Sequence, residues 1–106
     1  MINNKKILGL IGLAARARKI SFGTDSTIQE IEKGKVKLVI IASDASDRTK
    51  RKFKEKCIKH SISIIQYETI EQLSKSIGKQ NKAVIGIKDN NIASEIERIN
   101  RGDMNG

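Results

Sequence analysis

The sequence predicts a single-domain α/β protein, a three-layer α/β/α sandwich around a mixed but mostly parallel central sheet. Two observations lead to this prediction. Segments with apolar residues at three- and four-residue spacing alternate with short runs of β-branched and apolar residues. The chain has 106 residues, of which 38% are hydrophobic, enough for one compact domain with its own core. Because strands that alternate with helices need crossover connections, most neighbouring strands are expected to be parallel.

The first helix follows from an apolar stripe near the N-terminus. Its apolar residues recur at helical spacing, which predicts a helix that begins at Asn3 or Asn4. The stripe consists of Ile7, Leu10, Ile11, Ala14 and Ala17. Gly9 and Gly12 interrupt it at a cost of about 1 kcal/mol each relative to alanine. Their missing side chains are therefore expected to allow close packing of this helix against a neighbour.

A break at residues 21–23 separates this helix from a second one. Thr24 or Asp25 is expected to cap the second helix, and Gly34 stands where a C-terminal cap glycine belongs. Residues 36–42 are rich in β-branched and apolar side chains, as in a strand covered on both faces.

The remaining chain is expected to form three helices and two strands. A basic helix follows the first strand, with Phe53 and Cys57 on its inner side. The loop and N-terminal cap before this helix are expected to consist of Ser43, Asp44, Ser46 and Asp47. The later elements are a strand at 62–67, a helix capped by Thr69 and Gln72 and ended by Gly78, a strand at 83–87, and a helix from Asn90 or Asn91. The domain is expected to cover residues 1–101, with residues 102–106 as a frayed tail.

The net charge of +9 makes a polyanion the expected partner. Two regions concentrate this charge: residues 1–23 contain no acid, and residues 48–60 contain Glu55 as their only acid among many bases. The aromatic content of 3% is too low for a protein that stacks single-stranded bases or anchors in a membrane interface. These features favour contact with the backbone and shape of a folded RNA, with the basic helix at 48–59 as a less specific phosphate surface.

Other function classes lack the residues they need. A single cysteine, Cys57, cannot form an internal disulfide, and together with His60 it provides too few ligands for zinc. No phosphate-binding loop, dinucleotide fingerprint or catalytic constellation is present. The apolar stretches are much shorter than a membrane span of about 20 residues. We therefore expect a cytoplasmic, monomeric protein without catalytic activity, metal or cofactor.

Four segments resemble the kink-turn-binding L7Ae/L30e family of ribosomal proteins, in particular its short bacterial YlxQ-like branch. They are residues 8–19 (LGLIGLAARARK), 22–34 (FGTDSTIQEIEKG), 37–45 (KLVIIASDA) and 73–87 (LSKSIGKQNKAVIGI). They occur in the order and spacing of that family. The resemblance implies the same α/β/α fold and a role in binding structured or ribosomal RNA, in contact with the ribosome. The kink-turn that the family recognises is a bent helix–bulge–helix with tandem sheared G·A pairs.

The resemblance also implies a binding site at the start of the second helix. The family motif there is a glycine, any residue, asparagine, glutamate, two further residues and lysine. Gly23 matches the glycine, while Asp25, Ser26 and Gln29 stand at the three polar positions, with Thr24 between. Flanking contacts are expected from Lys37 and from a loop at 78–82 with Lys79 and Lys82. Further electrostatic support is expected from Arg16, Arg18 and Lys19.

Two alternatives remain open from the sequence. The same fold can serve as a protein–protein adaptor that has lost kink-turn specificity, since three of the motif positions carry other residues. It can also form the RNA-binding part of a methyltransferase, but this chain is too short to hold a cofactor domain as well.

Overall fold

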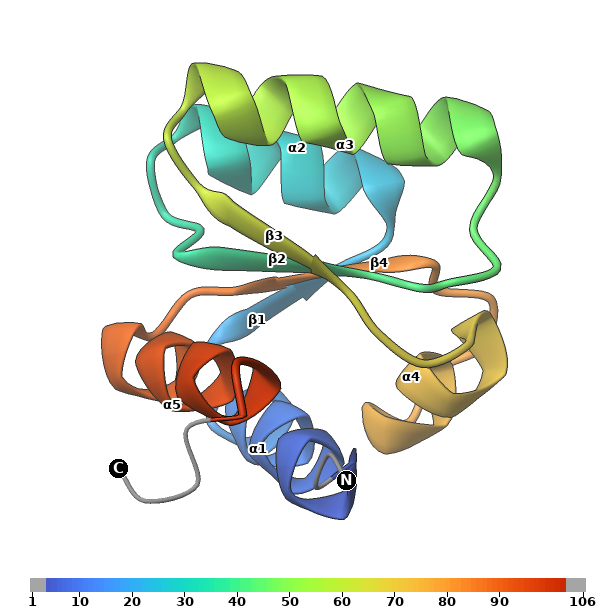
Figure 1. Cartoon of the computed structure of the whole chain (residues 1–106), viewed down its shortest axis with the longest axis vertical. Helices are drawn as coiled ribbons and strands as arrows, with labels where there is room; N and C mark the ends of the chain where they lie inside the picture. Colours follow the sequence, from blue (N-terminus) through green and yellow to red (C-terminus); the bar gives the residue numbers. More distant parts are fainter. Residues whose placement is uncertain (1–3, 103–106) are drawn as a thin grey trace.

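The computed structural model describes residues 4–102 and has the α/β/α architecture expected from the sequence. Helices α2 and α3 cover one face of a four-stranded sheet, and α1, α4 and α5 cover the other (Figure 1). The elements are α1 (Asn4–Arg16), β1 (Ile20–Phe22), α2 (Thr24–Glu32), β2 (Leu38–Ile41), α3 (Asp47–Lys59), β3 (Ser63–Gln66), α4 (Ile70–Ser76), β4 (Val84–Ile87) and α5 (Asn90–Asn100). The frayed tail expected at 102–106 lies, beyond Gly102, outside the described residues.

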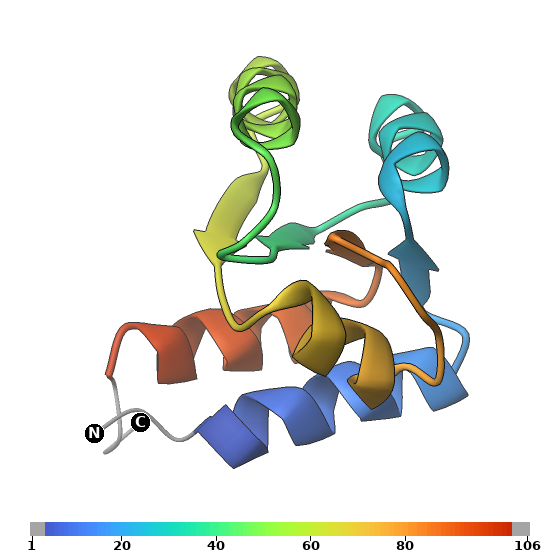
Figure 2. The ribbon, with the colours of Figure 1, turned by 90° about the vertical axis from the view of Figure 1, so that its right-hand side faces the viewer.

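The sheet is mixed, but the expectation that it is mostly parallel was wrong. Its strand order is β1-β4-β2-β3, and only β2 and β3 pair in parallel, while β4 runs antiparallel to both of its neighbours. The connection that contains α4, a helix of 7 residues, does not carry the chain back to the end of the sheet at which β3 begins. The chain therefore starts β4 at the same end at which β3 stops (Figure 2).

Strand β1 occupies the segment that the sequence presented as a break. It is only three residues long and contains Ser21 between Ile20 and Phe22. Its strand conformation depends on antiparallel pairing with β4, in which Ile20 lies opposite Ile87. Because that pairing joins residues far apart in the sequence, no local pattern indicates it.

The core lies on both faces of the two central strands. Every residue of β2 and β4 is buried, as expected for strands covered by helices on both sides. The helices contribute inward stripes, such as Ile7 and Ile11 of α1. Gly12 is buried, and a Cβ atom there would lie 3.4 Å from the Ser76 carbonyl of α4, so close packing at this glycine is confirmed. The same expectation for Gly9 was wrong, since nothing lies within 4 Å of its Cβ position.

The capping of α2 differs from that expected from the sequence, and Asp44 supports a different helix from the one expected. Gly23, rather than Thr24 or Asp25, is the N-cap of α2 and provides no side-chain hydrogen bond. Ser46 caps α3 by accepting a hydrogen bond from the amide of Thr49 at 3.1 Å. Asp44 instead accepts from the amide of Ile70 at 2.8 Å and so supports α4, a contact that exists only in the folded chain. Asp47 lies in the first turn of α3, where a carboxylate favours the helix dipole.

Candidate nucleic-acid interface

A hollow of about 390 Å³ opens where β1 ends, α2 begins and the chain approaches β4. The amide of Gly23 donates to the Val84 carbonyl at 2.9 Å, which joins the start of α2 to the start of β4. We call this hollow the Gly23 groove; its lining residues are Phe22, Gly23, Thr24, Asp25, Ser26, Asn81, Lys82 and Ala83. It brings together the motif residues at 23–26 and the loop at 78–82.

Gly23 keeps the groove open and turns the chain into α2. Its φ of 90° lies in a region that side-chain-bearing residues rarely adopt. A Cβ atom there would approach the side chain of Lys82 to 3.7 Å and occupy part of the groove. Because Gly23 has no side chain to cap the helix, the first-turn N–H groups of α2 remain available to an anion.

The loop that closes the groove carries two cations over an aromatic ring. The ammonium groups of Lys79 and Lys82 lie 4.8 Å and 5.9 Å from the centre of the Phe22 ring. Ser74, which is buried, fixes this loop, since its hydroxyl accepts from the amide of Lys82 at 2.8 Å. Both lysines are thus held at the rim of the groove by an anchored backbone and a cation–π contact.

The polar side chains of α2 line up on the exposed side of the helix. Asp25 and Ser26 are exposed in its first turn, and Gln29 is exposed one turn further along. Gln29 lies four residues after Asp25 and three after Ser26, so all three occupy neighbouring positions on the helix surface. This is the arrangement that the family motif implies.

The other cations expected at the site lie elsewhere. Lys37 donates its amide to the Ile87 carbonyl at 2.7 Å, and Lys88 donates to the Lys19 carbonyl at 2.8 Å. These contacts place Lys37, Lys19 and the neighbouring Arg18 where β4 ends, whereas the groove lies where β4 begins. Lys37 therefore does not line the Gly23 groove, and its expected contact with RNA stays a prediction. Arg16 lies beside Gly12 at the α1–α4 contact and lines neither end.

Sequence reasoning missed some of the residues that build the groove. Ala83 lines it next to the expected loop at 78–82, and Ser74 anchors that loop from within α4. No local pattern distinguishes Ser74 from an ordinary helical serine. Phe22 was noticeable as one of few aromatic residues, but its contact with the two lysines depends on the fold.

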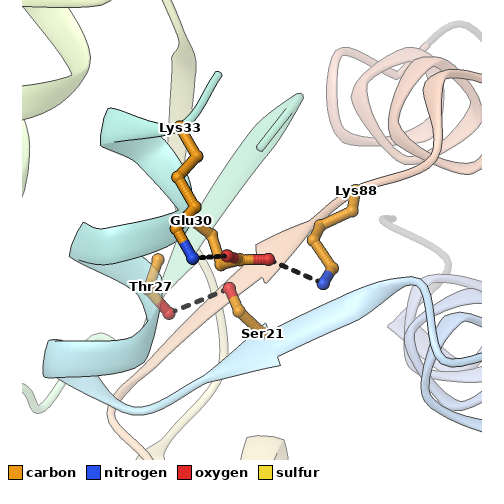
Figure 3. A network of polar contacts seen from close by, with 5 residues as sticks. All are labelled: Ser21, Thr27, Glu30, Lys33 and Lys88. Carbon is orange, nitrogen blue, oxygen red and sulfur yellow. Dashed lines mark hydrogen bonds and ion pairs between the residues drawn. The ribbon is translucent and has the colours of Figure 1, made fainter. Parts of the chain in front are cut away.

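A polar network fixes α2 against the sheet (Figure 3). The Ser21 hydroxyl of β1 donates to the hydroxyl of Thr27 at 3.2 Å, and both residues are buried. Towards the end of α2, Lys88 donates to Glu30 at 2.9 Å, and this hydrogen bond is the main reason that the pKa of Glu30 lies below its usual value. Lys33 lies 3.8 Å from the same carboxylate. The orientation of the groove helix is thus set at both ends.

Cys57 is a free, buried cysteine in α3. Burial raises the pKa of the Cys57 thiol to about 11, so the group stays protonated and unreactive at neutral pH. Within residues 4–102, no group of three or more metal-binding side chains is found. In the same part of the chain, no helix has the length and apolar character needed to cross a bilayer.

The model of the ribosomal protein L7Ae/L30e/S12e/Gadd45 family matches residues 5–97. The chain belongs to this family. The matched segment contains the elements from α1 to β4 and most of α5.

Similar proteins place the chain in the bacterial branch expected from the sequence. It is 37% identical over 100 residues to a protein of Enterococcus faecium named RNA-binding protein YlxQ, covering 94% of this chain and 96% of that protein. A protein of the same name from Bacillus subtilis (strain 168) is 37% identical over 87 residues, with coverage of 82% and 87%. The resemblance to the YlxQ-like branch is therefore confirmed.

Two solved structures share the fold. A protein of unknown function from Bacillus halodurans C superimposes with a TM-score of 0.85 at 36% identity, covering 89% of this chain and 95% of that one. The Giardia lamblia 15.5kD RNA binding protein superimposes with a TM-score of 0.77 at 21% identity, covering 93% and 86%. At that identity, the second likeness supports the L7Ae/L30e fold alone.

Proposed function

We propose that this chain is a non-enzymatic RNA-binding protein that recognises a kink-turn-like fold through the Gly23 groove. The observation that carries the proposal is the groove itself, which joins the family's motif position at the start of α2 to a loop with two lysines at its rim. Its family membership and its similarity to two RNA-binding proteins named YlxQ support RNA as the partner.

Each part of the groove suits one feature of such an RNA. The first-turn amides of α2, together with Lys79 and Lys82, offer donors and positive charge to backbone phosphates. Asp25 and Ser26 offer oxygen atoms to the N–H groups of guanine edges. The anchored loop at 78–82 can close over the unpaired nucleotides of the bulge. We infer that the partner is ribosomal or another structured RNA, bound in the cytoplasm by a monomer that needs no metal or cofactor.

A three-RNA titration tests this function. The purified, nuclease-treated protein is titrated with a kink-turn RNA, with the same RNA after replacement of its tandem G·A pairs, and with a plain duplex, each over a range of salt concentrations. We expect the kink-turn to bind about 10³-fold more tightly than the other two at physiological salt, the lower end of specificity for DNA-binding proteins. The reason is that the replaced RNA retains its phosphates but loses the guanine edges.

Equal affinity for all three RNAs, falling steeply with salt for each, would overturn the kink-turn assignment. Such binding would consist of backbone electrostatics alone. No binding to any RNA would overturn the proposed function as a whole and favour the protein–protein adaptor that the altered motif also permits.

A further inference from the structure

A second hollow, of about 350 Å³, lies at the opposite end of β4 from the Gly23 groove. Its lining residues are Arg18, Lys19, Gly34, Lys35, Lys37 and Lys88, so that every side chain around it is a cation and none is an acid. We call it the distal basic hollow. Four separate segments contribute to it: the turns after α1 and α2, the start of β2 and the end of β4.

The C-terminal turns of α1 and α2 have the same backbone hydrogen bonds and form one side of the hollow. After α1, the amides of Arg18 and Lys19 donate to the carbonyls of Ala15 and Ala14, at 3.1 Å and 2.8 Å. After α2, the amides of Gly34 and Lys35 make the equivalent bonds, at 3.0 Å each, to Ile31 and Glu30. Both helices therefore end in a Schellman motif whose next residue is a lysine. These backbone bonds fix where Lys19 and Lys35 leave the chain.

Arg18 occupies a position that would suit glycine better. The motif requires a left-handed residue, which is Gly34 (φ 74°) after α2 but Arg18 (φ 59°) after α1. A residue with a Cβ atom is strained in this conformation, whereas glycine is not. The arginine therefore brings a cation to the hollow at a cost in backbone strain.

Glu30 offsets part of the charge of the hollow, since it pairs with Lys88 and also attracts Lys35. Lys88 pairs with Glu30, which also attracts Lys33 (Figure 3). Among the described residues, no ion pair is found for the other four lining cations. The negative ends of the dipoles of α1 and α2 attract cations to the turns that follow them. That attraction does not account for Lys37, which lies at the start of β2. Like charges gathered around one hollow also repel each other.

We propose that the distal basic hollow binds phosphates of the RNA backbone, as a second contact separate from the Gly23 groove. The proposal rests on the proposed function in that the partner is RNA. Helix α2 runs from the groove to the hollow, and its 9 residues separate the two by about 13 Å or more. An RNA arm that leaves the groove and follows this helix reaches the hollow, while a short arm does not.

The test compares two lengths of RNA on one charge-reduced variant. Arg18→Gln/Lys37→Gln is titrated with a kink-turn RNA whose arms are trimmed close to the kink and with one whose arms extend about 16 base pairs, the span of a double-stranded RNA-binding domain. On the long RNA we expect Kd to rise about tenfold and the slope of log K against log salt to become shallower by about 1.4 to 1.8, the value for two lost phosphate contacts. On the short RNA, Kd should stay within a factor of two of the parent's, since about 13 Å exceeds the screening length of about 8 Å at physiological salt.

A matched control removes the same charge elsewhere. Lys5 and Arg101 are exposed at the opposite ends of α1 and α5 from the hollow. Lys5→Gln/Arg101→Gln should bind the long RNA as the parent does. An equal loss in this control, or an equal loss by the hollow variant on both RNAs, would show a net-charge effect and would overturn the proposal.

A second variant separates RNA contact from folding. Arg18→Gly relieves the left-handed strain, so the melting temperature should rise by a few degrees while long-RNA binding weakens. Ser61 has the same conformation (φ 56°) after α3, and Ser61→Gly should raise the melting temperature without changing RNA binding. If Arg18→Gly keeps the parent's affinity for the long RNA, the hollow is not an RNA contact.

The two proposals fail in different ways. Loss of preference for tandem G·A pairs overturns kink-turn recognition. The dependence of affinity on RNA length would still be measurable on plain duplexes of the two lengths. Conversely, a kink-turn preference that is independent of arm length overturns only the distal contact.

Discussion

Asp25 is the residue at which this groove differs most from the family motif. An asparagine at that position could both accept and donate a hydrogen bond, whereas a carboxylate only accepts and also repels nearby phosphates. Asp25 is exposed in the first turn of α2, where its charge favours the helix dipole. Its carboxylate therefore stabilises the helix slightly while opposing the anion that the same helix end attracts.

Asp25→Asn should improve kink-turn binding. The substitution removes the repulsion and restores an amide donor, so we expect Kd to fall about tenfold, as for one charge-assisted contact of about 1.4 kcal/mol. Isothermal titration calorimetry with the kink-turn RNA measures the change. Asp25→Ala is the matched control, since it also removes the charge but offers no donor or acceptor, and it should abolish discrimination between the kink-turn and the G·A-replaced RNA. If Asp25→Asn binds no better than the parent, the side chain does not contact the RNA.

At the scale of elements, α2 packs closely on the centre of the sheet because β4 has a glycine, Gly86, at that point. Gly86 of β4 lies directly beneath the Ser21–Thr27 hydrogen bond that joins β1 to α2. A Cβ atom at Gly86 would lie 2.6 Å from the Ser21 hydroxyl and 3.1 Å from both Thr27 and Val36. The missing side chain thus lets α2 and the turn before β2 pack closely on the sheet. This packing positions the start of α2, which lines the Gly23 groove.

Gly86→Ala should destabilise the fold by about 1 to 3 kcal/mol, the usual cost of overpacking a core. The added methyl group must displace the Ser21 hydroxyl and separate α2 from the sheet. Urea denaturation followed by circular dichroism measures the free energy of unfolding.

Gly9→Ala serves as the opposite control for that experiment. Gly9 is exposed inside α1 with nothing within 4 Å of its Cβ position, so alanine should stabilise the protein by about 0.5 to 1 kcal/mol. Equal stability of Gly86→Ala and the parent would mean that α2 packs less tightly than the structure indicates.

At the scale of the whole molecule, positive charge surrounds the fold rather than marking one site. The Gly23 groove and the distal basic hollow lie at the two ends of β4, and α3 adds a basic helix on the outside. Only Lys56 of α3 pairs with an acid of another described element, Glu32 at 2.7 Å. Such a distribution attracts RNA from many directions, while base edges are read only where polar groups converge.

Neutralising α3 should weaken all RNA binding equally. Arg48 and Lys52 are exposed and lie four residues apart, so Arg48→Gln/Lys52→Gln also removes a repulsive pair and should leave the fold intact. We expect affinities for the kink-turn and the plain duplex to fall by the same factor, because long flexible side chains on a helix contact phosphates and not base edges. Electrophoretic mobility shifts with both RNAs measure the ratio. A changed ratio would show that α3 contributes to recognition rather than to general attraction.

The sequence by itself determined which segments become helices and central strands, and which residues face the core. Residues 36–42 and 83–87 had to be strands covered on both faces because they are apolar without alternation, and the stripes of α1 and α3 had to face inward. It also determined the net charge and the segment at 22–34 that identifies the family. These properties are local or additive, so a linear pattern contains them.

Only the tertiary structure decided which of these pieces meet. The pairing of β1 with β4, the antiparallel course of β4, and the contact of Asp44 with α4 join residues that are distant in the sequence. For the same reason, the sequence grouped cations that the fold divides: Lys79 and Lys82 lie at the groove, whereas Lys37 lies with Arg18 in the distal basic hollow. Whether two side chains share a site depends on the end of the strand to which each belongs, and strand direction follows from long-range pairing that no local pattern specifies.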